Sequence, residues 1–209
     1  MLDQDNTIYM SKELRTQFRQ YAKRFYLANA DVEEQNYEKW ISEISRKHSY
    51  NWYNLLQSLN IHPHKFADEV IDRLEVENFL SRDDKLISAL EELSLPIYIV
   101  TASTPKFSQR VRITLGIEHL IKQAYIVNFP TEDVFRSQNK IDYYNLILEN
   151  EFVQPSEVCI FGDSYLLDLK DAELAGFNTV LVGRDRVYKL KIDKIYEINN
   201  IIRQLNTSQ

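Results

Sequence analysis

The sequence predicts an α/β protein in which helices cover a parallel β-sheet and a further group of helices is inserted after the first strand. From residue 83 onward, short β-rich runs alternate with segments of helical periodicity, and this alternation is typical of βαβ units. Residues 11–82 show helical periodicity alone. The chain contains only four glycines, of which the first is Gly116, and this predicts few tight turns in the first half.

The composition is that of a globular protein with an acidic balance. The chain has 209 residues, with 25 Lys and Arg against 31 Asp and Glu and a net charge of -6. Because a nucleic-acid binder needs a basic face, we expect no nucleic-acid polymer as partner. The apolar runs are shorter than the roughly 18 residues of a membrane helix, so we expect no membrane either. The single cysteine, Cys159, excludes a disulfide framework within one chain. We expect the protein to be cytoplasmic, and to be a monomer or a homodimer.

The first strand is unusually short in the sequence. Only Met1 and Leu2 precede Asp3, whereas strands usually have about 5–6 residues. We therefore expect either a start further upstream or a stunted central strand that holds Asp3 less rigidly.

The segment 11–82 is predicted to be a separate helical domain. Apolar residues recur at helical spacing in four stretches: Leu14, Phe18, Tyr21, Ala22 and Phe25; Tyr37, Trp40, Ile41 and Ile44; Trp52, Leu55, Leu56 and Leu59; and Val70, Ile71 and Leu74. The predicted organisation is a core of residues 1–10 and 83–209 and an inserted helical domain of residues 11–82.

The core is predicted to alternate helices and strands in a regular order. The helices are expected at residues 83–93, 106–115, 140–149 and 168–175, and the strands at 97–100, 124–128, 158–161 and 178–182. Gly116 and Gly176 follow two of the helices, where glycine commonly ends a helix. The carboxyl ends of parallel strands meet at one edge of the sheet, and ligands bind there in such folds.

Polar side chains follow the predicted strands at that edge. The set consists of Asp3, Asp5 and Thr7 after the first strand, Thr101 and Ala102 after the second, Lys140 at the start of a helix, and Asp163, Ser164 and Asp168 after a later strand. Oxygen ligands without His or Cys favour Mg²⁺. A cation, a lysine and a hydroxyl together can neutralise a phosphate. One carboxylate can then act as nucleophile, and another two residues later as general acid and base.

These motifs resemble those of the haloacid dehalogenase-like (HAD) superfamily. The resemblance consists of Asp-x-Asp-x-Thr from Asp3, a hydrophobic strand ending at Thr101, a central Lys140, and Gly-Asp-Ser-x-x-x-Asp from Gly162. It implies a Rossmann-like parallel sheet core with a small α-helical cap inserted after the first strand. The string from Asp3 to Tyr9 looks most like the pyrimidine 5′-nucleotidase branch.

The resemblance also implies a role for each residue. Asp3 would be the nucleophile and a Mg²⁺ ligand, and Asp5 the general acid and base, with its main-chain carbonyl on the metal. Thr101, Ala102 and Lys140 would bind the phosphoryl group, and Asp163 would be a direct metal ligand. Thr7, Ser164 and Asp168 would support these residues, Asp168 through water or by orienting Lys140. Lys122 is an alternative to Lys140 whose spacing fits less well.

The predicted function is a Mg²⁺-dependent phosphohydrolase that cleaves a small phosphomonoester through an aspartyl-phosphate. A nucleoside monophosphate is one candidate for this small phosphorylated metabolite. A sugar phosphomutase and a non-catalytic HAD-like binding protein remain as alternatives. A dehalogenase is less favoured, because that branch does not use an acid at the position of Asp5. A phospho-acceptor receiver domain is less favoured because it lacks a long helical insertion.

Overall fold

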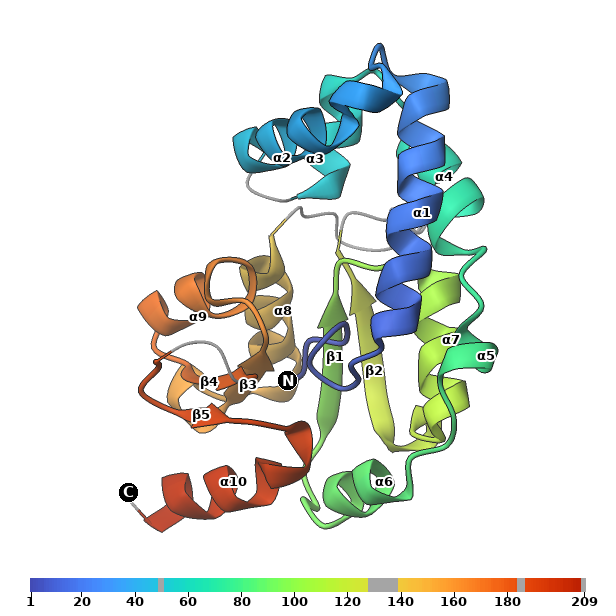
Figure 1. Ribbon diagram of the computed structural model, residues 1–209. Coiled ribbons are helices and arrows are strands. Elements are labelled where there is room, and N and C mark those ends of the chain that lie inside the picture. Colours follow the sequence, from blue (N-terminus) through green and yellow to red (C-terminus); the bar gives the residue numbers. More distant parts are fainter. Residues whose placement is uncertain (49–50, 128–138, 184–186, 208–209) are drawn as a thin grey trace. The chain divides into compact units, whose positions relative to one another are not determined.

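The computed structural model describes residues 1–48, 51–127, 139–183 and 187–207 (Figure 1). The chain divides into two compact units. The α/β unit consists of Met1–Met10 and Leu80–Gln209, and the helical unit of Ser11–Phe79. This division assigns residues 80–82 to the α/β unit.

The helical unit is built around one cluster of aromatic rings. It contains α1 (Lys12–Asn29), α2 (Tyr37–Lys47), α3 (Trp52–Ser58), α4 (Pro63–Phe66), a π-helical turn (Ala67–Ile71) and α5 (Val76–Phe79), with a 3₁₀ turn at Glu34–Asn36. Ser11 begins α1 by accepting a hydrogen bond from the amide of Leu14 at 3.1 Å. The ring of Phe66 is fully buried and lies against Phe18, Phe25, Tyr26 and Trp52. In the fourth predicted stretch, Val70 and Ile71 lie in the π-helical turn that continues α4, whereas Leu74 lies in the bend before the single turn α5.

The sheet of the α/β unit is parallel and is joined through Leu2. β1 (Ile97–Thr101) pairs with β2 (Ile121–Ile126), while β3 (Cys159–Gly162) pairs with β4 (Asn178–Val182), which pairs with β5 (Lys191–Ile192). Leu2 forms parallel bridges to both Ile99 and Phe161. The order across the sheet is therefore β2–β1–Leu2–β3–β4–β5, with the residues around Leu2 as the central strand (Figure 1).

The short central strand is hydrogen-bonded on both sides. The amide of Leu2 donates to the carbonyl of Tyr98 at 2.8 Å, and the amide of Asp3 donates to the carbonyl of Phe161 at 2.9 Å. In return, the carbonyl of Leu2 accepts from the amide of Val100 at 3.0 Å. The strand is short, as one of the two expectations from the sequence has it, and its residues Met1–Asp3 are hydrogen-bonded to β1 through Leu2 and to β3 through Met1 and Asp3.

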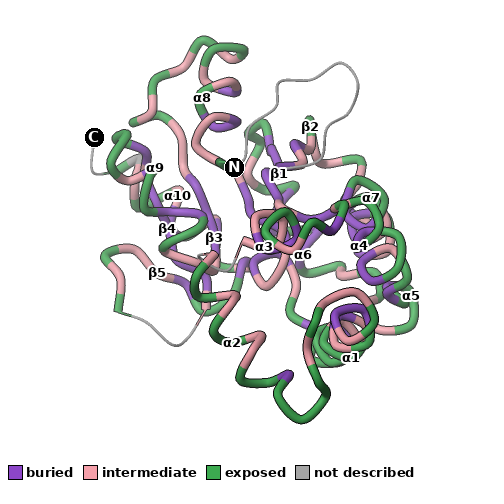
Figure 2. Tube along the Cα trace, turned by 90° about the horizontal axis from the view of Figure 1, so that it is seen from above, coloured by how far each residue is buried: buried purple, intermediate pink, exposed green. Residues whose placement is uncertain are grey.

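Helices pack against this sheet, and their buried side chains form the hydrophobic core together with those of the strands. They are α6 (Asp84–Glu91), α7 (Pro105–Leu115), α8 (Lys140–Glu151), a π-helical turn (Tyr165–Leu169) continued by α9 (Lys170–Leu174), and α10 (Ile198–Thr207). Short 3₁₀ turns lie at Glu118–Leu120, Pro155–Glu157 and Ile195–Glu197. On one face of the sheet, Val100 and Ile160 pack with Tyr144 and Ile147 of α8 and with Leu169. In Figure 2 the strands β1, β3 and β4 are drawn mostly as buried.

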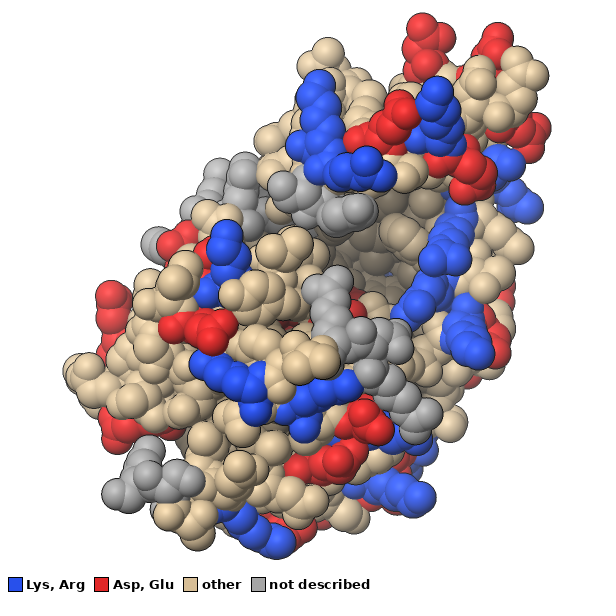
Figure 3. Space-filling view, turned by 60° about the vertical axis from the view of Figure 1, so that its left-hand side comes forward, with Lys and Arg blue, Asp and Glu red and all other residues tan. Residues whose placement is uncertain are grey.

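The predicted fold class is confirmed, and the differences lie at element ends. The helix predicted at 168–175 begins earlier, because Ser164 caps a π-helical turn by accepting a hydrogen bond from the amide of Leu167. The strand predicted at 124–128 begins at Ile121 and ends at Ile126, and Asn128 lies outside the described residues. Within the described part of the chain, no helix combines the length and the apolar character needed to cross a membrane. On the face drawn in Figure 3, basic and acidic side chains are interspersed.

Candidate active site

The predicted site residues come from four segments of the α/β unit. Asp3, Asp5 and Thr7 follow the central strand, Thr101 ends β1, Lys140 begins α8, and Asp163, Ser164 and Asp168 follow β3. Asp3, Thr7, Thr101 and Asp168 are buried. All of these residues belong to the α/β unit.

A tight turn orients the carboxylate of Asp3. Asn6 has a φ of 62°, a left-handed conformation that asparagine tolerates better than most residues. This turn brings the hydroxyl of Thr7 back to Asp3, where it donates to Oδ2 at 3.0 Å. The other oxygen, Oδ1, accepts from Lys140 Nζ at 2.5 Å. Both oxygens of Asp3 are therefore fixed by side chains.

Lys140 links two of the acids. Its Nζ lies 2.5 Å from Asp3 Oδ1 and 2.7 Å from Asp168 Oδ1. Burial alone lowers the pKa of Lys140, but the charges of Asp168 and Asp3 outweigh that effect and raise its pKa well above the usual value. Lys140 is therefore an ammonium ion at neutral pH. Lys122 forms an ion pair with Glu151 at 2.7 Å instead, so Lys140 occupies the position beside the acids.

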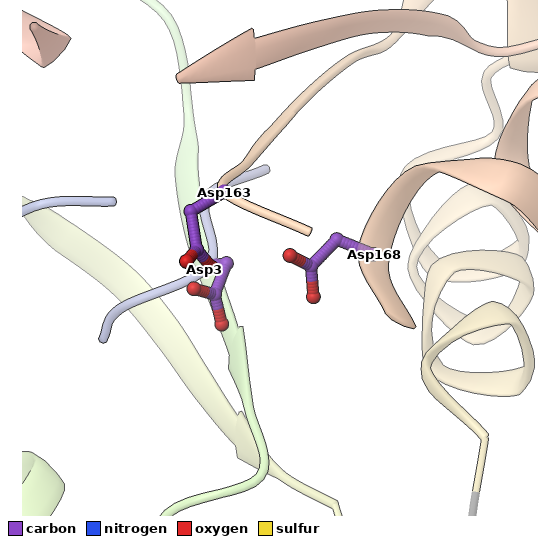
Figure 4. A group of neighbouring side chains, drawn as sticks. All are labelled: Asp3, Asp163 and Asp168. Atoms are coloured by element: carbon purple, nitrogen blue, oxygen red, sulfur yellow. The ribbon is translucent and has the colours of Figure 1, made fainter. Parts of the chain in front are cut away.

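Three carboxylates gather beside this lysine. One oxygen from each of Asp3, Asp163 and Asp168 lies within 4.8 Å of the others (Figure 4). Burial, followed by the charge of Asp168, raises the pKa of Asp163 to about 6. Burial also raises the pKa of Asp3, while Lys140 opposes that shift. Three acids with one lysine leave a surplus of negative charge, and an all-oxygen set of this kind fits a hard divalent cation such as Mg²⁺.

Both carboxylate oxygens of Asp168 accept a hydrogen bond within the site. Its Oδ2 accepts from the amide of Ser164 at 2.9 Å, and its Oδ1 accepts directly from Lys140. Gly162 makes room for it, because a Cβ on Gly162 would lie 2.5 Å from Asp168 Cβ and 2.7 Å from Oδ2. The glycine of the Gly-Asp-Ser-x-x-x-Asp motif is thus required by a side chain six residues further along the chain.

Asp5 lies apart from the carboxylate group. Its Oδ2 accepts from Thr101 Oγ1 at 3.4 Å, and its Oδ1 accepts from the hydroxyl of Tyr9. Burial raises the pKa of Asp5, while the hydrogen bond from Tyr9 opposes the shift. Its carboxylate is not part of the group formed by Asp3, Asp163 and Asp168, and its predicted metal contact runs through the main chain.

The end of β1 supplies a buried hydroxyl beside Asp5. Thr101 is fully buried, and its Oγ1 also accepts from the amide of Ser103 at 3.2 Å. Ala102 lies between them in the bend that precedes α7 and is half-buried. Thr104 caps α7 by accepting from the amide of Phe107 at 3.1 Å, so the helix begins immediately after these residues.

Tyr9 and Gln4 make contacts that the sequence patterns did not predict. The hydroxyl of Tyr9 donates to Oδ1 of Asp5. Gln4 lies between the two aspartates, and its buried amide oxygen accepts from Ser108 Oγ of α7 at 2.8 Å. The alternation of side chains along an extended segment predicts that Gln4 faces away from Asp3 and Asp5. Its partner could not be read from the sequence.

Known structures share this fold at low sequence identity. The HAD-family protein YfnB from Bacillus subtilis, solved with bound magnesium, matches with a TM-score of 0.64 and 16% identity over 97% of this chain and 96% of its own. The HAD phosphatase from Thermococcus onnurineus matches with a TM-score of 0.60 and 21% identity over 96% and 95%. The HAD-like protein SP0104 from Streptococcus pneumoniae matches with a TM-score of 0.60 and 15% identity over 96% and 97%.

These likenesses establish the fold, and a family model establishes the relationship. No protein among the curated sequences matches the chain significantly. The model of the haloacid dehalogenase-like hydrolases matches residues 1–176, a span that begins before Asp3 and extends beyond Asp168. The chain therefore belongs to the haloacid dehalogenase-like hydrolase family.

Proposed function

We propose that this protein is a Mg²⁺-dependent phosphohydrolase that cleaves a small phosphomonoester through an aspartyl-phosphate. The observation that carries the proposal is the fixed carboxylate of Asp3, with Thr7 on one oxygen and Lys140 on the other. A carboxylate held in this way is preorganised to attack a phosphorus atom, because little orientation is left to be lost in the transition state.

Each of the surrounding residues would have a separate role in catalysis. Lys140 and the hydroxyl of Thr101 would stabilise the charge on the phosphoryl oxygens, with the backbone at Ala102 beside them. Asp5 would protonate the leaving oxygen and later take a proton from the hydrolytic water. Asp3 and Asp163, with the main-chain carbonyl of Asp5, would hold Mg²⁺, which supplies charge neutralisation to the bound phosphate. Asp168 would keep Lys140 in place, as their 2.7 Å contact suggests.

The substrate class is the least constrained part of the proposal. The string from Asp3 to Tyr9, with its likeness to the pyrimidine 5′-nucleotidase branch, makes nucleoside monophosphates the first compounds to screen. We assign Ser11–Phe79 the role of a cap that selects the substrate, because this unit is inserted immediately after the Asp3–Thr7 segment. The single cysteine fits a reducing compartment such as the cytoplasm, and we expect no nucleic-acid polymer or membrane as partner.

The proposal is tested by the hydrolysis of p-nitrophenyl phosphate with Mg²⁺ and with EDTA. We expect metal-dependent turnover in the wild type and its loss in Asp3→Asn, because an amide cannot form the acyl phosphate. Asp171→Asn is the matched control, since Asp171 lies on α9 and is exposed. Equal activity in Asp3→Asn and wild type would contradict the proposal.

Product analysis separates the alternatives when p-nitrophenyl phosphate and a sugar phosphate are each supplied as substrate. Inorganic phosphate released in stoichiometric amount supports a phosphohydrolase. An isomerised sugar phosphate formed without phosphate release would identify a mutase instead. A folded wild type that binds phosphate analogues without turning over any ester would indicate a non-catalytic relative.

A further inference from the structure

The hydroxyl of Tyr9 contacts the acid that is expected to move the proton. Tyr9 follows Asp5 by four residues, and an isolated β-bridge also joins the backbones of the two residues. The Tyr9 hydroxyl donates to Asp5 Oδ1, while Thr101 Oγ1 donates to Asp5 Oδ2 at 3.4 Å. The two oxygens of Asp5 are therefore distinguished by their partners, one on the same turn and the other on β1.

The hydrogen bonds from Tyr9 and Thr101 leave the two oxygens of Asp5 unequally available for proton transfer. A phenol has one hydroxyl hydrogen, and Tyr9 gives it to Oδ1, which is thereby occupied as an acceptor. The contact from Thr101 to Oδ2 is longer and weaker. Thr101 also belongs to the residues assigned to the phosphoryl group, so Oδ2 is the oxygen on the side of the reaction.

We propose that Tyr9 is a positioning residue, which fixes the carboxyl group of Asp5 so that Oδ2 carries the transferred proton. The inference rests on the proposed phosphohydrolase chemistry. Tyr9 neither gains nor loses a proton in it, and acts only by holding Oδ1. Without that hydrogen bond the Asp5 carboxyl can rotate, and either oxygen can turn away from the leaving group.

The reaction assigns Asp5 one proton transfer in each step. In the first step, an Asp3 oxygen forms a bond to phosphorus, the bond from phosphorus to the ester oxygen breaks, and that oxygen takes the proton from Asp5. In the second step, the water oxygen bonds to phosphorus, the bond from phosphorus to Asp3 breaks, and Asp5 takes the water's proton. Asp5 thus ends each cycle protonated, as it began.

Leaving-group dependence separates this role from a structural one. Nitrophenolate departs readily without a proton, whereas phenolate depends more on protonation in the transition state. Misorientation of Asp5 should therefore slow the cleavage of phenyl phosphate more than that of p-nitrophenyl phosphate. A general loss of folded enzyme would lower both rates by the same factor.

The experiment measures kcat and KM for both esters with Mg²⁺ on the full chain. We expect Tyr9→Phe to lower kcat/KM, which reports the step that releases the leaving group, about tenfold more for phenyl phosphate than for p-nitrophenyl phosphate, a fraction of the ~10²–10⁴ range of general acid catalysis. The matched control is Tyr98→Phe, because Tyr98 also donates to a carboxylate, that of Glu151, and lies outside the site. We expect Tyr98→Phe to leave both kcat/KM values unchanged.

A second arm tests whether Tyr9 acts through Asp5. In the Asp5→Asn background, Tyr9→Phe should have no further effect on kcat/KM, because the group it positions no longer transfers a proton. The inference would be overturned if Tyr9→Phe lowered the rate equally for both esters. It would also be overturned if Tyr9→Phe lowered the rate in the Asp5→Asn background by the same factor as in the wild type. If the wild type hydrolysed neither ester, the proposed function itself would fail, and the inference with it.

Discussion

At the scale of a single residue, the buried charge of Asp163 lowers the free energy of unfolding at neutral pH. Burial and the neighbouring Asp168 raise its pKa to about 6, above the usual value of 3.8 for an aspartate. The folded protein therefore binds the Asp163 proton more tightly than the unfolded chain does. Stability from this group is fully present below pH 4 and is lost as the pH rises through 6. The ionised carboxylate costs folding free energy at neutral pH, by at most about 3 kcal/mol for a shift of this size.

We predict that Asp163→Asn stabilises the protein in EDTA at pH 7.5. The amide keeps the shape of the side chain and removes the buried charge, so the melting temperature should rise by a few degrees. At pH 4.5, where Asp163 is largely protonated in the folded protein, the difference between the two melting temperatures should be much smaller than at pH 7.5. Thermal unfolding followed by circular dichroism at both pH values is the measurement.

Asp171→Asn again serves as the control, because Asp171 is exposed on α9 and should not change the melting temperature at either pH. Addition of Mg²⁺ should stabilise the wild type more than Asp163→Asn, since a carboxylate ligates the cation better than an amide. An Asp163→Asn variant that melts below the wild type at pH 7.5 in EDTA would refute this account.

At the scale of an element, the end of α8 carries avoidable strain. Its C-cap is Phe152, which has a φ of 55° and a ψ of 40°, and its side chain is 94% exposed. Glycine is the usual residue in this conformation, because a Cβ is disfavoured there. By contrast, α7 ends at Gly116 with a φ of 80°.

We predict that Phe152→Gly stabilises the protein by about 1 kcal/mol, because it relieves the left-handed strain and removes no buried surface. The measurement is the free energy of unfolding from urea titrations. Phe152→Ala is the matched control, since it removes the same ring and keeps the Cβ, and it should gain much less. If the two variants changed the free energy of unfolding equally, backbone strain would not be the cause.

At the scale of the whole molecule, the chain carries a separate intrinsic probe in each unit. Both tryptophans, Trp40 and Trp52, lie in the helical unit, where they pack on Tyr26 and Phe66. The only cysteine, Cys159, lies on β3 of the α/β unit. Burial raises the pKa of this thiol to about 12, so it should react slowly with thiol reagents at pH 8 until the α/β unit unfolds.

We predict that the tryptophan emission shifts at a lower urea concentration than the one that exposes Cys159. The helical unit is the smaller of the two, and smaller units bury a lower fraction of their surface and are less stable. Emission spectra and pulsed thiol labelling across one urea series give the two midpoints. Coincident midpoints would instead mean that the two units unfold as one cooperative structure.

The amino-acid sequence alone was enough to predict the fold class and the chemical character of the site. The period of the apolar residues distinguished strands from helices, and the order of the motifs placed Asp3, Thr101, Lys140 and Asp163 at strand and helix ends. These features are local, because each depends on spacing within a few residues. In a parallel sheet, local placement is enough to predict that the carboxyl ends of the strands meet.

The contacts between these side chains became visible only in the three-dimensional structure. It showed that the short strand at Leu2 is paired on both sides, that Lys140 rather than Lys122 reaches the acids, and that Tyr9 contacts Asp5. It also joined Gln4 to Ser108, which are 104 positions apart in the chain. Contacts of this kind depend on the register of strands and the packing of helices, which bring together side chains whose separation in sequence carries no periodic signal.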